Sequence, residues 1–204
     1  MTDTAINDRP SLHERKQELV RSELASAAWD LFGKKGYEAT TVTEIALAAG
    51  VSRRTFFRYY ASKEDVLAET SDALAEEILA AVDARPRDEA PWVAIRRALI
   101  PVLESRLLTR PERSRTIIRL LRESPSLRRA MLDRHARMEE RLALQLTDRL
   151  GADRATDSRP ALIAFVARAM LDTAFNVWHD QRRTDVAALV NELFTSLANL
   201  TRQT

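Results

Sequence analysis

Residues 41–60, TVTEIALAAGVSRRTFFRYY, contain two short helical patterns separated by a glycine turn. Thr41 and Glu44 have the spacing of a capping box, in which the hydroxyl and the carboxylate accept backbone N–H groups at the start of a helix. Gly50 is placed to end this first helix, and Ser52 is a suitable N-cap for the second. Two helices joined by a short turn that contains glycine have the outline of a helix-turn-helix.

The second of these helices places cationic and hydroxyl side chains on its first turns, the part that faces base edges when a recognition helix enters the major groove of DNA. Arginine can pair bidentately with guanine, and threonine can donate to phosphate or contact a thymine methyl. Lys63, in the first turn of the next helix, could contact a phosphate. The candidate DNA-contacting residues are Thr41, Thr43, Ser52, Arg53, Arg54, Thr55, Phe57, Arg58 and Lys63. On the residues alone, a solvated basic face of a helical hairpin explains the pattern equally well.

The composition of the whole chain favours an all-α fold. Only four of its 204 residues are glycines, and both β-hairpins and phosphate-binding loops consume glycine. The hydrophobic share of 45% is sufficient for a buried core. Apolar residues at helical spacing predict about nine helices. They cover about residues 12–33, 41–49, 53–59, 91–109, 111–123, 125–150, 159–182 and 185–201, and a further one begins near Ser62 and includes Val82.

Glycine and proline positions set the expected helix boundaries. We expect each glycine to lie where an apolar helical pattern ends, because a left-handed C-cap residue is favoured there. These glycines are Gly33, Gly36, Gly50 and Gly151. Pro101 falls inside a predicted helix and is expected to kink or break it, since proline removes one backbone hydrogen bond.

Several classes of function are disfavoured. The net charge is only +2, so any nucleic-acid-binding patch must be local, and the absence of cysteine excludes disulfides, thiolate metal sites and a cysteine nucleophile. We expect a cytoplasmic protein, because no apolar run reaches the roughly 18 residues of a membrane helix and the first residues do not resemble a signal peptide. The three histidines are isolated, and no HExxH, glycine-rich phosphate loop or GxSxG motif occurs. We therefore expect no enzyme, no metal site and no cofactor.

The last two predicted helices have broad apolar stripes and are joined by a short turn. They could pair with each other and still leave apolar surface for a two-fold partner to bury as a four-helix bundle. Alternatively, the rest of the same chain covers these faces. The candidate interface residues are Phe165, Ala169, Val177, Leu189, Leu193, Phe194 and Leu197.

About residues 14–66 resemble the TetR family of bacterial transcriptional regulators. The resemblance is carried by Ala27-Ala28, Leu31-Phe32, Gly36-Tyr37, Thr40-Thr41-Val42, Ile45-Ala46, Ala49-Gly50-Val51-Ser52, Thr55-Phe56-Phe57, Tyr59-Tyr60 and Ser62-Lys63-Glu64. It implies a homodimer that binds a pseudo-palindromic DNA operator and usually represses transcription until a small molecule enters the C-terminal domain. The implied domains are residues 12–62 for DNA binding and 63–204 for ligand binding and dimerisation.

The resemblance also implies roles for individual residues. Thr43 would approach DNA from the first helix of the motif, Arg53, Arg54 and Thr55 would face bases or phosphates, and Phe57, Arg58 and Lys63 would lie along the backbone. The family commonly has tyrosine at Phe57 and often histidine at Arg58. Phe57 cannot make the hydrogen bond of that hydroxyl, and is expected to pack against sugars or a thymine methyl. The permanent charge of Arg58 could compensate.

An effector pocket is implied among the helices that follow, lined by apolar side chains and a few polar ones. The candidates on inward stripes are Trp92, Ile95, Leu99, Ile117, Leu121, Met131, His135, Met138, Phe165, Met170 and Trp178, each of which could instead be plain core. Arginines are dense over residues 106–141, where they form either a solvated face or, with Arg119 and Arg122, the mouth of a pocket for an anionic acyl thioester. Two other functions stay open: a helical module that docks on protein, and a DNA binder that senses no small molecule.

Overall fold

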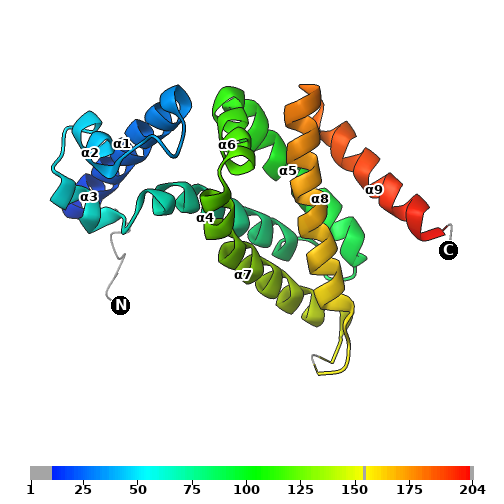
Figure 1. Ribbon diagram of the computed structural model, residues 1–204. Coiled ribbons are helices and arrows are strands. Elements are labelled where there is room, and N and C mark those ends of the chain that lie inside the picture. The colour runs from blue at the N-terminus through cyan, green and yellow to red at the C-terminus, as the bar shows by residue number, and fades with distance from the viewer. Residues whose placement is uncertain (1–10, 154, 203–204) are drawn as a thin grey trace, which may run out of the picture. The chain divides into compact units, whose positions relative to one another are not determined.

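The computed structural model describes residues 11–153 and 155–202, which form helices and their connections with no β-strand (Figure 1). The chain divides into two compact units, one ending at Val66 and the other beginning at Leu67. The predicted all-α fold is confirmed. The helices of the described residues are α1 (Leu12–Lys35), α2 (Val42–Ala48), α3 (Arg53–Tyr59), α4 (Lys63–Asp83), α5 (Pro91–Thr109), α6 (Pro111–Glu123), α7 (Pro125–Leu150), α8 (Arg159–Gln181) and α9 (Val186–Arg202).

One apolar cluster organises the first unit. On α1, Leu24, Ala28 and Phe32 recur one turn apart and are fully buried. Ile45 of α2 and Phe56 of α3 are also fully buried. Each of the three helices therefore contributes its apolar side to a single core, which fixes how α2 and α3 are held.

The turn between α2 and α3 has the backbone that its glycine predicts. Gly50 has a φ of +67°, a left-handed conformation that favours glycine. Its N–H donates to the carbonyl of Leu47 (3.0 Å), and the N–H of Val51 donates to that of Ala46 (2.9 Å), the two bonds of a Schellman motif. The boundary expected at Gly33 is wrong, because α1 continues through that residue and ends at Gly36.

The second unit has a core shared by α4 to α9. Its largest fully buried side chains include Leu103, Leu146 and Trp178. Pro101 lies inside α5 without ending the helix. The residue is exposed, so water can solvate the carbonyl that loses its partner, and the expected break does not occur.

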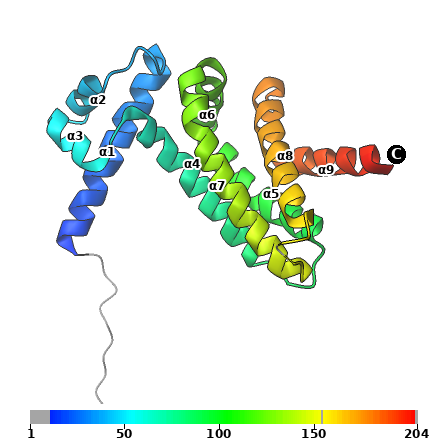
Figure 2. The same ribbon diagram turned by 60° about the horizontal axis from the view of Figure 1, so that its bottom comes forward.

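Three arginines of the second unit pair with acids of α4. Helices α4 and α7 run side by side (Figures 1 and 2), joined by the ion pairs Arg134–Asp72 and Arg141–Glu76. On α5, Arg106 lies 2.5 Å from a carboxylate oxygen of Glu77. These pairs place three arginines of the dense segment, Arg106, Arg134 and Arg141, on a salt-bridged face.

Among the described helices, α8 alone is long and apolar enough to cross a membrane by length and composition. Core helices of soluble proteins share that property. Midway along α8, Arg168 forms ion pairs with Glu139 and Asp172. The buried face of α8, which includes Ala167 and Leu171, packs in the core of the second unit. These contacts are those of a core helix.

Candidate functional site

Helix α3 presents four exposed side chains on one side and buries the opposite side. Phe56 is fully buried, whereas Arg53, Arg54, Phe57 and Arg58 are exposed. At 3.6 residues per turn these four positions fall on one face of the helix. The face combines three cations with one aromatic ring, the side chains expected of a surface that meets DNA.

This face carries a local positive charge. Between Ile45 and Ser62 the sequence has three arginines and neither Asp nor Glu. The Arg53 guanidinium carbon lies 5.4 Å from the centre of the Phe57 ring, a cation–π contact that leaves the charge uncompensated. In the part of the chain that the structure describes, no carboxylate pairs with any arginine of α3. The electrostatic condition for phosphate attraction is therefore met on α3.

Two hydroxyls predicted to contact DNA also cap the motif's helices. The Ser52 Oγ accepts the Thr55 backbone N–H (3.0 Å) and lies 2.9 Å from the Thr55 Oγ1. The Thr41 Oγ1 accepts the Glu44 N–H (3.3 Å) and donates to the Glu44 carboxylate (2.7 Å), so the predicted capping box is confirmed. Thr43 is exposed on α2.

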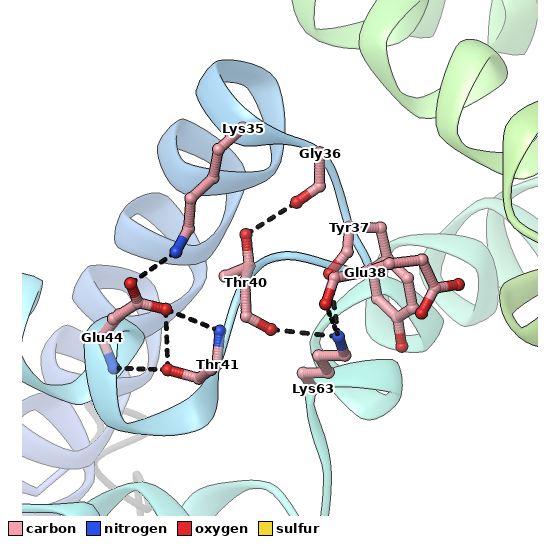
Figure 3. A network of polar contacts seen from close by, with 8 residues as sticks. All are labelled: Lys35, Gly36, Tyr37, Glu38, Thr40, Thr41, Glu44 and Lys63. Carbon is pink, nitrogen blue, oxygen red and sulfur yellow. Dashed lines mark hydrogen bonds and ion pairs between the residues drawn. The ribbon is translucent and has the colours of Figure 1, made fainter.

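The Glu44 carboxylate connects α2 to the end of α1 (Figure 3). The Lys35 Nζ donates to it at 2.5 Å, and the Thr41 backbone N–H donates at 2.9 Å. The hydrogen bonds from Lys35 and then from Thr41 hold the pKa of Glu44 at about 2, so the carboxylate is ionised at neutral pH. Sequence spacing suggested the capping box but gave no sign of the contact with Lys35.

Lys63 contacts the connection between α1 and α2 (Figure 3). Its Nζ lies 2.8 Å from the carbonyl oxygen of Tyr37, 3.0 Å from that of Thr40 and 3.4 Å from that of Glu38. The ammonium is also 4.2 Å from the centre of the Tyr37 ring. Because an ammonium has three donors, these carbonyls occupy the group that was expected to contact a phosphate.

Replacement of Lys63 by methionine removes this ammonium and its hydrogen bonds to three carbonyls, of which that of Tyr37 keeps the Thr40 N–H as a donor at 3.2 Å. We expect the free energy of unfolding of the first unit to fall by about 1–3 kcal/mol. Hydrogen exchange of the α2 and α3 amides reports this local stability. Lys34→Met, at an exposed lysine of α1, is the control and should change it by less than about 0.5 kcal/mol. Unchanged amide protection in K63M would contradict this structural role.

A cavity in the second unit has almost entirely apolar walls. Its apolar lining comes from four helices: Ile78 and Val82 of α4, Ile95 and Leu99 of α5, Met138 and Leu142 of α7, and Ala164, Ala167 and Leu171 of α8. Three of these residues, Ile95, Leu99 and Met138, are among the predicted pocket residues. The only charged lining residues in the described chain are Glu139 and Arg168.

His135 lies close to the charged residues of the cavity wall. Burial lowers the pKa of His135 from its ordinary value of 6.5, while Asp172 acts in the opposite direction and Arg168 adds to the lowering. The imidazole is therefore neutral at neutral pH. Glu139 and Arg168 are cavity-lining residues that were not among the predicted ones. No sequence signal marks these two residues, because the burial of Ala167 beside Arg168 follows only from the packing of α8.

The remaining predicted pocket residues are scattered. Met170 lines a second cavity together with Leu99, Phe194 and others. The Trp92 ring packs edge-on against Phe194, and Trp178 is fully buried with its ring 4.2 Å from the Arg115 guanidinium carbon. Four further candidates, Ile117, Leu121, Met131 and Phe165, line neither cavity.

The predicted interface residues differ in how far they are exposed. Phe165 of α8 is 54% exposed, whereas Leu189 of α9 is 1% exposed and lies in the protomer core. The partly buried residues are Ala169, Val177, Leu193, Phe194 and Leu197. The stripe that sequence analysis recognised on α8 is thus its outer side, and the buried side is a row of smaller residues that includes Ala164 and Ala167.

Comparison with known proteins identifies this architecture. The model of bacterial regulatory proteins of the tetR family matches residues 24–70, and the model of the MftR C-terminal domain matches residues 89–201. The HTH-type transcriptional regulator TcmR of Streptomyces glaucescens is 36% identical over 88% of this chain and 82% of its own. The chain belongs to the TetR family.

Two further TetR-family proteins resemble this one along most of its length. MftR of Mycobacterium tuberculosis is 30% identical over 80% of this chain and 82% of its own. Thermus thermophilus FadR, a repressor solved in complex with lauroyl-CoA, is 28% identical with a TM-score of 0.55, over 87% of this chain and 93% of its own. This TetR-family protein is therefore a helix-turn-helix, DNA-binding transcriptional regulator and not an enzyme. Proteins of this family bind DNA operators as dimers and respond to small molecules.

Proposed function

We propose that this regulator represses transcription from a pseudo-palindromic operator, which it binds through α2 and α3 of a DNA-binding domain formed by residues 12–62. The exposed, acid-free face of α3 carries the proposal. Its three arginines remain unpaired by carboxylates in the described chain, unlike Arg122 of the second unit, which lies 2.5 Å from Asp180. The operator would lie in the cytoplasm, where we place the protein.

We assign DNA contacts according to exposure. Arg53 and Arg54, at the start of α3, face bases, and Arg58 faces the phosphate backbone. Phe57 packs against sugar or a thymine methyl, and Thr43 approaches from α2. The N-terminal ends of α2 and α3 are fixed by Thr41, Ser52 and Thr55. Backbone N–H groups at these ends are available to phosphate. Lys63 shapes the connection before α2.

We assign dimerisation to residues 63–204 and to the outer side of α8 with the end of α9. The exposed apolar residues there are Leu162, Phe165 and Leu200. A two-fold partner would bury them on both copies and thereby form a four-helix bundle. Two recognition helices about 34–36 Å apart can then engage both half-sites of an operator.

We assign the effector to the cavity formed by α4, α5, α7 and α8. Ile78 and Val82 of α4 line it, so a molecule bound there contacts the helix whose first residues, including Lys63, belong to the first unit. Such a molecule lowers operator affinity only to the extent that it binds the dimer state that cannot engage the operator more tightly than the state that can. An apolar molecule suits these walls. The lauroyl-CoA complex of Thermus thermophilus FadR favours an acyl thioester as the second candidate.

Binding to DNA fragments that flank the protein's own coding sequence tests the proposed function. We expect fluorescence anisotropy to show tight binding that random duplex does not displace. Affinity should fall steeply with salt, because each neutralised phosphate releases counterions. Weak, salt-insensitive binding to these fragments and to a genome-wide pool would instead favour a module that docks on protein.

A further inference from the structure

Phe57 is an apolar side chain in the middle of the cationic face of α3, and the inference drawn from it rests on the proposed binding of an operator by that face. The side chain is 45% exposed, although most aromatic side chains of the first unit are buried. At about 100° per residue, Phe57 lies about 40° around the helix from Arg53 and about 60° from Arg54. It therefore lies between the two arginines assigned to bases, whereas Arg58, assigned to the phosphate backbone, lies at the edge of the face.

Two contacts hold the Phe57 ring in place. Its centre lies 5.6 Å from that of the Phe56 ring, and the two rings are inclined at 85°. Phe56 is fully buried, so this edge contact anchors the exposed ring to the core of the first unit. The Arg53 guanidinium carbon lies over the Phe57 ring, 5.4 Å from its centre. A ring held by two such neighbours loses little conformational freedom when it meets DNA.

An exposed ring without a polar atom recognises apolar groups of DNA. In the major groove, the apolar group that differs between base pairs is the C5-methyl of thymine. Deoxyribose is also apolar, but it belongs to the backbone, and the central position of Phe57 on the face favours the bases. The methyl is therefore the group that this ring is best placed to contact.

Arg53 extends this contact to a neighbouring base pair. Within the described residues its guanidinium has no carboxylate partner, so its N–H groups remain available to the O6 and N7 of guanine. Base pairs stack about 3.4 Å apart, which is less than the 5.4 Å between the guanidinium carbon and the centre of the Phe57 ring. The two side chains can therefore reach adjacent base pairs together.

We propose that Phe57 and Arg53 read one step of each operator half-site, a thymine methyl next to a guanine. The ring excludes water from the methyl, and the guanidinium pairs with the guanine beside it. Because 5-methylcytosine carries the same methyl on the same carbon, it contacts the ring as thymine does. An operator with cytosine at this position therefore binds more tightly when that cytosine is methylated.

Replacement of each operator thymine in turn by deoxyuridine tests the proposal, because uracil keeps the hydrogen-bonding edge of thymine and lacks only the methyl. The operator is the flanking or genome-selected fragment that the wild-type protein binds specifically. Fluorescence anisotropy with the full-length protein gives the dissociation constants. We expect affinity to fall about fourfold at one thymine of a half-site, next to a guanine, and about fifteenfold when both half-sites are changed.

Phe57→Ala shows whether the ring is responsible. This variant should bind the thymine and deoxyuridine operators within about 1.5-fold of each other, because the ring that contacts the methyl is gone. The ratio stays informative even where F57A binds all DNA more weakly. Leu19→Ala is the matched control, since Leu19 of α1 is 62% exposed and its replacement also removes apolar surface from the first unit. L19A should keep the fourfold preference.

Two further base changes separate the methyl from the guanine. With a C·G pair at the sensitive position, methylation of that cytosine should raise the affinity of the wild-type protein about fourfold and leave that of F57A unchanged. Replacement of the neighbouring guanine by 7-deazaguanine, which lacks the N7 acceptor, should lower wild-type affinity about fivefold. Arg53→Ala should be insensitive to this second change.

Three outcomes would overturn the proposal. One is a wild-type protein whose affinity no deoxyuridine lowers by more than about twofold, a result that does not depend on how any variant folds. Another is an unchanged preference for thymine in F57A. The third is a sensitive thymine with no guanine beside it. Specific binding of the unmodified operator is measured in the same titrations, so these outcomes reject only the methyl contact, whereas the absence of any specific binding rejects the proposed function as well.

Discussion

Arg54→Ala lowers the affinity of the dimer for its operator by about thirtyfold or more and leaves the dimer intact. A bidentate arginine–guanine contact contributes about 1–3 kcal/mol. A two-fold dimer loses two of them, and about 2 kcal/mol corresponds to a factor of roughly thirty. Arg54 is exposed and, in the described chain, forms neither an ion pair nor a ring contact, so its loss should leave the fold unchanged. Anisotropy with the operator measures affinity, and sedimentation measures the dimer.

Arg129→Ala is the matched control for Arg54→Ala. Arg129 is an exposed arginine of α7 in the second unit, so its replacement changes the net charge equally without touching α3. The affinity of R129A should remain within about twofold of wild type. Equal operator affinity in R54A and the wild-type protein would remove Arg54 from the contact surface and shift base recognition to Arg53.

Phe165→Lys weakens dimerisation by about a hundredfold or more. In the proposed interface a two-fold axis would bury two such ammonium groups in apolar surroundings, and an unpaired buried charge costs several kcal/mol. Arg168, whose guanidinium carbon lies 5.6 Å from the Phe165 ring centre, repels the new cation instead of pairing with it. Operator affinity should fall as well, because a monomer engages a single half-site.

Sedimentation equilibrium of F165K decides whether α8 forms the interface. Leu132→Lys is the control, because Leu132 is 63% exposed but belongs to α7. We expect L132K to dimerise like the wild-type protein. If F165K remains as dimeric as L132K, the outer side of α8 lies outside the interface, and the exposed apolar residues need another explanation.

The helices and their caps could be predicted because the signals are local. The capping box of Thr41 and Glu44 and the turn at Gly50 each lie within a few residues of the sequence. Gly33 was assigned to a helix end because a single glycine looks the same there as inside a helix, where it costs only about 1 kcal/mol relative to alanine. The packing on either side of α1 decides between these positions.

The charged contacts were less predictable because their partners are distant in sequence. Arg134 pairs with Asp72, and Arg141 with Glu76, whereas the sequence offered closer acids such as Asp133 and Glu140. The Lys63 contact likewise requires the path of the connection that precedes α2. Periodicity places a side chain on a face of a helix, but only the packing of helices selects which neighbour that face meets.

The apolar stripes of α8 and α9 illustrate the same limit. Leu189 and Phe165 lie on comparable stripes, yet one is enclosed in its own protomer and the other is exposed. A helix with more than one apolar side has several possible partners, and hydrophobicity alone does not distinguish a core from an interface. The effector cavity could be anticipated only in part, since it is a space bounded by residues from four helices.

The continuity of α4 has a consequence for how this protein can be recombined. The boundary between the two units, at Val66, falls inside α4, which begins at Lys63. A chimera that exchanges DNA-binding units between relatives must therefore be joined within a helix and in phase with its turns, because one inserted residue would rotate all following side chains by about 100°. A graft that stops at Ser62 would also omit the lysine that closes the connection before α2, so the exchangeable module extends at least to Val66.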